Sequence, residues 1–102
     1  MFGMINQSQQ IECQEARDML ENHDAQLVDV RTPQEHSNGT LPGSVNVPLQ
    51  FINQAHDQLD KSKPVIVYCV SGARSAQALP VLQSMGFDNV HNLGSINKYL
   101  TC

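Results

Sequence analysis

The sequence predicts an α/β domain with a central, mostly parallel sheet flanked by helices. Two observations predict it: short strand-like apolar runs alternate along the chain with stretches of helical periodicity, and one run is apolar throughout. That run, VIVYC at residues 65–69, is typical of a strand buried on both faces at the centre of a parallel sheet. The length of 102 residues fits one domain, so we expect a single unit over residues 1–102.

The first half of the chain predicts three short strands and one helix. We expect a strand at residues 9–12 and a helix at residues 13–22, where Ala16, Met19 and Leu20 recur at helical spacing. A strand at residues 26–30 follows, and the turn signal Thr32-Pro33 ends it. The segment 37–48 is rich in Gly, Pro, Asn and Ser, which predicts a loop around a short strand at residues 44–47.

The second half predicts two helices that alternate with two strands. We expect helices at residues 50–59 and 74–85, and the second should end at Gly86. Pro80 removes one backbone donor inside that second helix. A last strand at residues 89–93 and a turn of helix at residues 96–100 follow. The expected inner faces of the two longer helices carry Ile52, Ala55, Leu59, Ala78, Leu79, Leu82 and Met85.

Composition argues against several classes of function. The net charge is −4 with six Lys and Arg, so no basic face is expected for nucleic acid. No apolar run approaches the length of a membrane span, and the N-terminus lacks the basic start of a signal peptide. We therefore expect a cytoplasmic protein that binds neither nucleic acid nor membrane. A monomer is expected, because no apolar stripe is left over.

The cysteines and histidines suggest neither disulfides nor metal. Three cysteines are an odd number without a CxxC pair, which favours a reducing compartment over a disulfide framework. Cys13 is expected to be structural, and the terminal Cys102 to be mobile and open to oxidation. The four histidines lack metal-ligand spacing, so we expect no metal and no other cofactor.

One loop combines the features of a nucleophilic site. Cys69 ends the central strand and a helix begins at Arg74 or Ser75, so the cysteine faces backbone N–H groups and a helix N-terminus. Both favour a thiolate and lower the pKa of Cys69. Arg74 adds a fixed positive charge for an oxyanion such as thiosulfate. The loop positions between them are Val70, Ser71, Gly72 and Ala73.

Three segments resemble the rhodanese family. The segment CVSGARSAQAL at residues 69–79 is similar to the rhodanese active-site loop, where C-x-x-G-x-R-S is frequent. The segment LVDVRTPQEHSNGTLPGSVNVPL at residues 27–49 resembles the upstream signature of the family, and GFDNVHNLGS at residues 86–95 resembles the stretch after the catalytic helix. Together they cover about two-thirds of the chain, in the family order. The resemblance implies a rhodanese-like three-layer domain.

The resemblance also implies roles for individual residues. Cys69 would accept sulfur as a persulfide, the amides from Val70 to Ser75 would cradle it, and Arg74 would help to hold an anionic substrate. Asp29 and Arg31 occupy the D-V-R positions that support the site in the family. The sequence departs from the family at two positions of the upstream signature: His36 stands where an aromatic is usual, and Thr40 where His is frequent.

The expected reaction is a double displacement. Cys69 takes the outer sulfur of thiosulfate or a related donor and passes it to cyanide, a thiol or a protein acceptor. A persulfide carrier or interaction module that serves a partner protein is the main alternative. A cysteine phosphatase or arsenate reductase is a weaker one, because only four residues separate Cys69 from Arg74 where such phosphatases have five. The tighter ring suits a single sulfur better than a tetrahedral phosphate.

Overall fold

A computed structural model describes residues 9–102 and contains one four-stranded sheet. Every strand pair is parallel, and the spatial order is β2-β1-β3-β4. The strands are β1 (Gln26–Asp29), β2 (Val45–Asn46), β3 (Val65–Cys69) and β4 (Val90–Ser95). The predicted α/β class with a parallel central sheet is confirmed.

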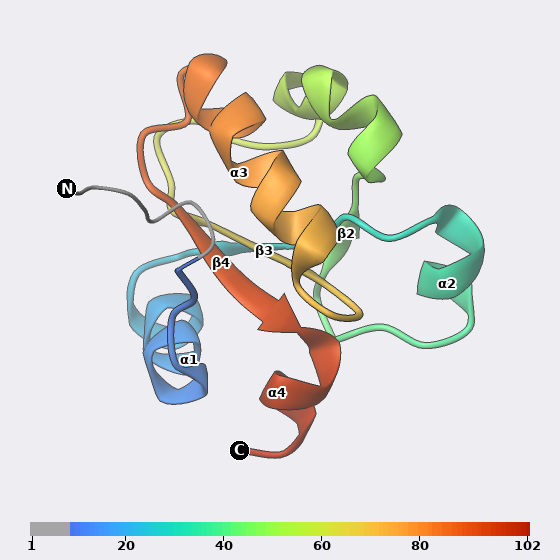
Figure 1. Ribbon diagram of the computed structural model, residues 1–102. Coiled ribbons are helices and arrows are strands. Elements are labelled where there is room, and N and C mark those ends of the chain that lie inside the picture. Colours follow the sequence, from blue (N-terminus) through green and yellow to red (C-terminus); the bar gives the residue numbers. More distant parts are fainter. Residues whose placement is uncertain (1–8) are drawn as a thin grey trace, which may run out of the picture.

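Helices cover both faces of the sheet and complete a three-layer domain (Figure 1). α3 (Ala73–Ser84) and the 3₁₀ helix η1 (Leu49–Asp57) pack on one face. α1 (Cys13–Asn22) and α4 (Ile96–Leu100) pack on the other. The short helix α2 (Pro33–Ser37) lies beyond the carboxyl end of β1.

The central strand β3 contributes to two apolar cores. Val65, Val67 and Cys69 face α3 and η1, whereas Ile66 and Tyr68 face α1 and α4. All five side chains are buried, because the pleat of a strand directs alternate residues to opposite faces. Burial of one such side chain contributes about 1.5–3 kcal/mol. These contacts fix the end of β3, and with it Cys69, between two packed layers.

The predicted inner helix faces are largely confirmed. Leu59, just past η1, is buried, whereas Met85 is only partly buried. The buried helix residues are Ile52, Ala55, Ala78, Leu79 and Leu82. Pro80 lies inside α3 without ending it.

Three elements differ from the sequence prediction. The expected first strand is reduced to a single parallel bridge between Gln10 and Asn92. The segment predicted as a helix at residues 50–59 is a 3₁₀ helix with a kink at Phe51. The helix α2 forms where only a turn was expected, because Thr32 and Glu35 make a reciprocal capping box around its first turn.

Two cysteines correct the expectation that the chain holds no disulfide. Cys13 at the start of α1 and Cys102 at the C-terminus are disulfide-bonded, and their Cα atoms lie 6.3 Å apart. The fold brings them together because α1 contacts α4. Arg17 donates a hydrogen bond to the carbonyl oxygen of Tyr99 at 3.2 Å, and the Arg17 guanidinium lies over the aromatic ring of Tyr99. Cys102 is therefore tethered rather than mobile.

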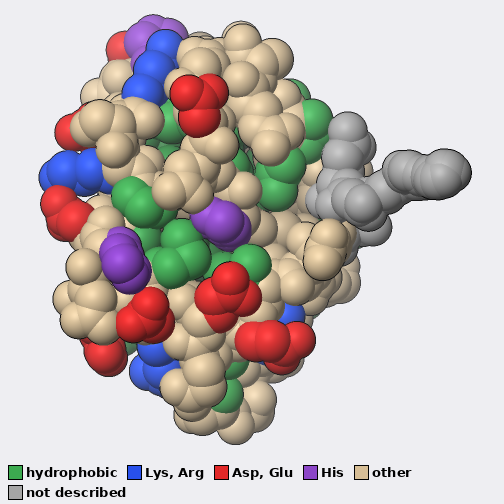
Figure 2. Space-filling model, turned by 90° about the vertical axis from the view of Figure 1, so that its left-hand side faces the viewer, with side chains coloured by type: hydrophobic (Ala, Val, Ile, Leu, Met, Phe, Trp, Pro, Cys, Tyr) green, Lys and Arg blue, Asp and Glu red, His purple; other side chains and the backbone are tan. Residues whose placement is uncertain are grey.

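Acidic side chains and histidines surround a small apolar area on one face of the molecule, whereas Lys and Arg lie mainly toward its rim (Figure 2). This distribution agrees with the net charge of −4. Within residues 9–102, no helix has the length and apolar character needed to cross a membrane.

Candidate active site

Cys69 lies at the carboxyl end of the central strand, where ligands bind in open parallel sheets. Its side chain is 1% exposed and belongs to the core beneath α3. A short loop connects Cys69 to α3, whose N-cap is Gly72. The cysteine thus lies close to the N-terminus of a twelve-residue helix, which carries a partial positive charge.

Gly72 is required by the shape of this loop. Its φ of +101° is a left-handed conformation, and a Cβ added there would lie 2.6 Å from Nε2 of Gln10. In this conformation the Gly72 amide donates a hydrogen bond to Sγ of Cys69 at 3.0 Å. The glycine that the sequence places in the loop therefore aims one donor directly at the candidate nucleophile.

Further donors act on the same sulfur atom. The Ser75 hydroxyl lies 3.6 Å from Sγ of Cys69 and 3.1 Å from the carbonyl oxygen of Gly72. Burial by itself raises the pKa of Cys69, but hydrogen bonds from Ser75, Gly72 and the Arg74 amide outweigh it and hold that pKa below its usual value. The arrangement favours a thiolate, which is the reactive form of a cysteine.

Arg74 does not present a free guanidinium to the site. Its Nη1 and Nη2 atoms donate to the two carboxylate oxygens of Glu35 at 2.7 and 3.1 Å. The Arg74 hydrogen bond, with help from the Thr32 amide, lowers the pKa of Glu35 to about 2. The capping box of α2 thus holds a carboxylate against Arg74 and offsets its positive charge, and the role of Arg74 in substrate binding stays a prediction.

Asp29 and Arg31 form a buried ion pair behind the loop. Nη2 of Arg31 lies 2.7 Å from Oδ2 of Asp29, and the same oxygen lies 3.0 Å from Nδ1 of His36. Burial raises the pKa of Asp29, but the hydrogen bonds from Arg31 and His36 outweigh it and keep that pKa below its usual value. Thr40 donates to Asp29 as well and also contacts the Tyr68 hydroxyl.

Sequence reasoning missed several members of this arrangement. Glu35 was not singled out, although T-P-x-E is a capping-box pattern that marks a helix start and fixes where its carboxylate lies. His36 and Thr40 appeared only as departures from a family pattern, yet both contact Asp29. The sequence indicates only a core position for Tyr68. In the structure its hydroxyl also makes hydrogen bonds with the Leu41 amide and the Ser44 hydroxyl.

The structure brings most of the sequence-predicted site residues together. Contacts described above join Cys69, Gly72, Arg74 and Ser75. The other predicted site residues of this segment are exposed: Val70, Ser71 and Ala73. Asp29 and Arg31 lie one strand away, at the end of β1. Within residues 9–102, no group of three or more His, Cys, Asp or Glu residues is placed to hold a metal ion.

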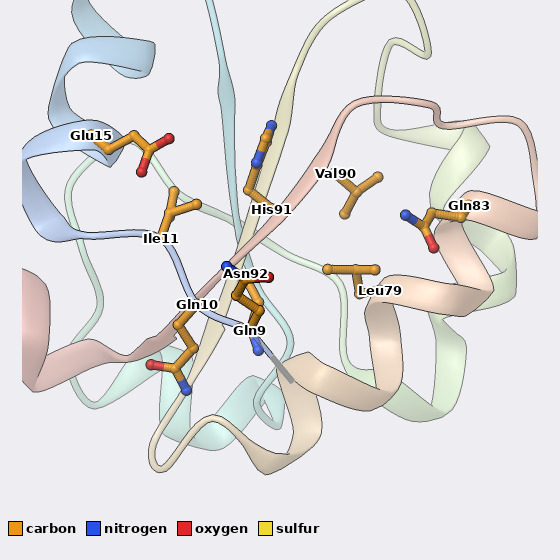
Figure 3. A pocket seen from close by; sticks show the side chains of 9 residues that line it. All are labelled: Gln9, Gln10, Ile11, Glu15, Leu79, Gln83, Val90, His91 and Asn92. Carbon is orange, nitrogen blue, oxygen red and sulfur yellow. The ribbon is translucent and has the colours of Figure 1, made fainter. Parts of the chain in front are cut away.

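Two hollows lie at different places around the sheet, one beyond the carboxyl ends of β1 and β2 and the other along β4. One, of about 320 Å³, adjoins the Cys69 loop and is lined by residues such as Val30, Leu49 and Arg74. The other, of about 340 Å³, runs along the edge strand β4 between α1 and α3 (Figure 3). Its lining includes Asn92, which is 1% exposed and whose side-chain amide has no partner among the described residues. The Cys69 loop does not line this second hollow.

Comparisons with known proteins agree on one kind of domain. The family model for the Rhodanese-like domain matches residues 12–102. Thiosulfate sulfurtransferase PspE of Escherichia coli is 35% identical over 71 residues, which cover 68% of each chain. The solved structure of the human single-domain sulfurtransferase TSTD1 superposes with a TM-score of 0.75 at 27% identity, covering 89% of this chain and 94% of that one.

A longer relative carries a different name. The tRNA uridine(34) hydroxylase of Buchnera aphidicola is 31% identical over 106 aligned positions, which cover 97% of this chain. The match spans 34% of that relative.

Proposed function

The chain belongs to the rhodanese-like domain family, and we propose that it is a sulfurtransferase in which Cys69 carries sulfane sulfur as a persulfide. The observation that carries this proposal is the Gly72 amide, which lies 3.0 Å from Sγ of Cys69 and, with Ser75 and Arg74, lowers the pKa of that thiol. A buried thiolate that faces backbone donors at a helix N-terminus is equipped to hold an anionic sulfur.

The proposed first half-reaction uses thiosulfate. The Cys69 thiolate attacks the outer sulfur, the bond between the two sulfur atoms of thiosulfate breaks, and sulfite leaves with the electron pair of that bond. The outer sulfur of the resulting persulfide carries negative charge, which the loop amides stabilise. In the second half-reaction, cyanide or a thiol attacks the outer sulfur and Cys69 leaves as a thiolate. One cysteine that serves both half-reactions predicts ping-pong kinetics.

The first experiment combines turnover with intact mass. The purified protein should produce thiocyanate from thiosulfate and cyanide, and thiosulfate alone should add the mass of one sulfur atom. Cys69→Ser should lose both, whereas the double variant Cys13→Ser/Cys102→Ser, which keeps Cys69 as its single cysteine, should retain both. Turnover by Cys69→Ser would contradict the proposal.

The same assay separates the competing functions. A persulfide carrier would take up sulfur but release it only to a partner protein, and a tRNA hydroxylase acting without a cysteine persulfide would show no added sulfur. A phosphatase or arsenate reductase would turn over its oxyanion without taking up sulfur. The −4 net charge supports a small-molecule or protein acceptor over nucleic acid.

A cytoplasmic location remains a prediction. The odd number of cysteines favours a reducing compartment, whereas Cys13 and Cys102 are disulfide-bonded in the structure. Structural disulfides persist mainly in oxidising compartments. Alkylation of thiols in intact cells before lysis tests the location: a reduced pair favours the cytoplasm, and an oxidised pair contradicts it.

A further inference from the structure

The hollow along β4 is a pocket of about 340 Å³ between α1 and α3 (Figure 3). Its volume lies in the range of small-molecule sites and exceeds the space that one buried water needs. Leu79 of α3 and Val90 of β4 are buried and give the pocket an apolar wall. Three exposed glutamines also line it: Gln9, Gln10 and Gln83. The pocket therefore joins an apolar wall to polar side chains that can turn towards an occupant.

Asn92 contributes a buried and unpaired amide to this pocket. The residue is 1% exposed, and neither Oδ1 nor Nδ2 has a hydrogen-bond partner among the described residues. Its backbone is held on both sides, opposite Val67 in β3 and through a carbonyl that accepts from the Ile11 amide at 2.9 Å. Buried polar side chains are nearly always hydrogen-bonded, because an unpaired one lowers stability. The unpaired amide therefore points to an occupant that supplies both missing partners.

The two unpaired atoms of Asn92 specify the chemistry of that occupant. Nδ2 donates and Oδ1 accepts, and the two atoms lie side by side on one planar amide. The matching group carries an acceptor and an N–H donor side by side. A primary amide or a lactam has such an edge, whereas a trans peptide bond directs its N–H and its C=O to opposite sides.

The charges around the pocket favour an uncharged occupant. None of the residues that line it is Lys or Arg, and Glu15 adds a carboxylate. The Lys98 ammonium, which is not part of the lining, donates to Oε1 of Gln10 at 3.3 Å. An anionic ligand would therefore meet the Glu15 carboxylate without a guanidinium to pair with, and this repulsion disfavours it.

We propose that this pocket binds a small uncharged molecule that carries a primary amide or a lactam on an apolar body. The amide edge makes two hydrogen bonds with the Asn92 side chain, and the apolar body packs on Leu79 and Val90. The Cys69 loop does not line the pocket, so this site is separate from the proposed sulfur-transfer site and does not depend on it.

Benzamide and acetophenone test the proposal as a matched pair, because a methyl group replaces the NH₂ group in acetophenone. Each compound is titrated into the ¹⁵N-labelled full chain, and NMR follows the side-chain NH₂ of Asn92 and the amides of Leu79 and Val90. We expect benzamide to bind at least fivefold more tightly and to shift these signals. Equal affinities, no shift at Asn92, or shifts confined to residues 69–75 would overturn the proposal. Tighter binding of acetylalanine N-methylamide, which has only trans amides, would also overturn it.

The variant Asn92→Leu replaces the unpaired amide by an apolar side chain of similar size. We expect benzamide to bind at least fivefold more weakly, and the urea midpoint of the free protein to rise by about 1 M, because the variant removes an unpaired buried polar group. The matched control Asn97→Leu changes an exposed asparagine on α4 and should keep both values.

Two results with Asn92→Leu would contradict the proposal. Unchanged affinity for benzamide would show that the Asn92 amide does not bind the compound. A lowered urea midpoint would show that this amide is already satisfied in the free protein. The comparison of benzamide with acetophenone uses the natural sequence, so it decides the proposal even if Asn92→Leu does not fold.

Discussion

Removal of the Cys13–Cys102 disulfide should destabilise the protein strongly and leave the free cysteine Cys69 unchanged. The bond joins residues 89 positions apart, so it closes nearly the whole chain into one loop. With that separation, the loop-entropy relation gives about 4.6 kcal/mol of stabilisation at 25 °C. This is a large share of the total for a domain of 102 residues, since such domains unfold at a cost of about 5–15 kcal/mol.

Urea unfolding with and without a reductant measures this contribution. At the denaturant dependence of a small domain, a loss of about 4.6 kcal/mol lowers the midpoint by about 3 M. The double variant Cys13→Ser/Cys102→Ser is the control, because its midpoint should already be low and should not respond to the reductant. Thiol titration of the unfolded, unreduced wild type should find Cys69 alone.

Two results would refute parts of this reasoning. Three reactive thiols in unfolded protein that was never reduced would refute the pairing itself. A confirmed disulfide whose reduction changes the free energy of unfolding by less than about 1 kcal/mol would refute the loop-entropy argument.

Three further perturbations test the site. The rate of sulfur uptake from thiosulfate should fall as the pH drops through the lowered pKa of Cys69. Ser75→Ala removes the hydroxyl that contacts the sulfur atom, so the fall in rate should begin at a higher pH. An unchanged pH profile would contradict a role of the Ser75 hydroxyl in lowering this pKa. Glu35→Gln removes the carboxylate that pairs with Arg74 and should lower KM for thiosulfate about fivefold, because roughly 1 kcal/mol of added attraction is expected at a partly exposed charge. A raised KM would show that Arg74 supports the site only while it is paired with Glu35. Asp29→Asn leaves a buried guanidinium without its counter-charge and should cost about 3–5 kcal/mol in urea unfolding, so a loss below about 1 kcal/mol would be incompatible with the buried pair.

The sequence predicted the elements that depend on local periodicity. The strand VIVYC was identified because its continuous apolar character needs burial on both faces, and the structure buries all five residues. The helices that begin near Cys13 and Arg74 were predicted from apolar spacing, and their observed starts agree within one residue. Their register follows from side chains three or four positions apart, which neighbouring residues alone specify.

The candidate nucleophile was also predictable, although its role is still a proposal. Strand, cysteine, glycine-containing loop and helix follow one another within residues 65–84, so the contact of the Gly72 amide with Cys69 is local. Any loop of this type places backbone donors at the end of a strand. The sequence therefore sufficed to single out Cys69.

Tertiary structure alone decided the contacts between distant segments. Glu35 meets Arg74 across 39 positions, and Cys13 meets Cys102 across 89, so no local pattern indicates either pair. These pairs form because parallel strands bring their carboxyl ends to one edge of the sheet and because α1 and α4 share one face. Composition and periodicity determine which segments are strands and helices and where the candidate nucleophile lies. Packing determines which charges are paired around that cysteine and which two cysteines form a disulfide.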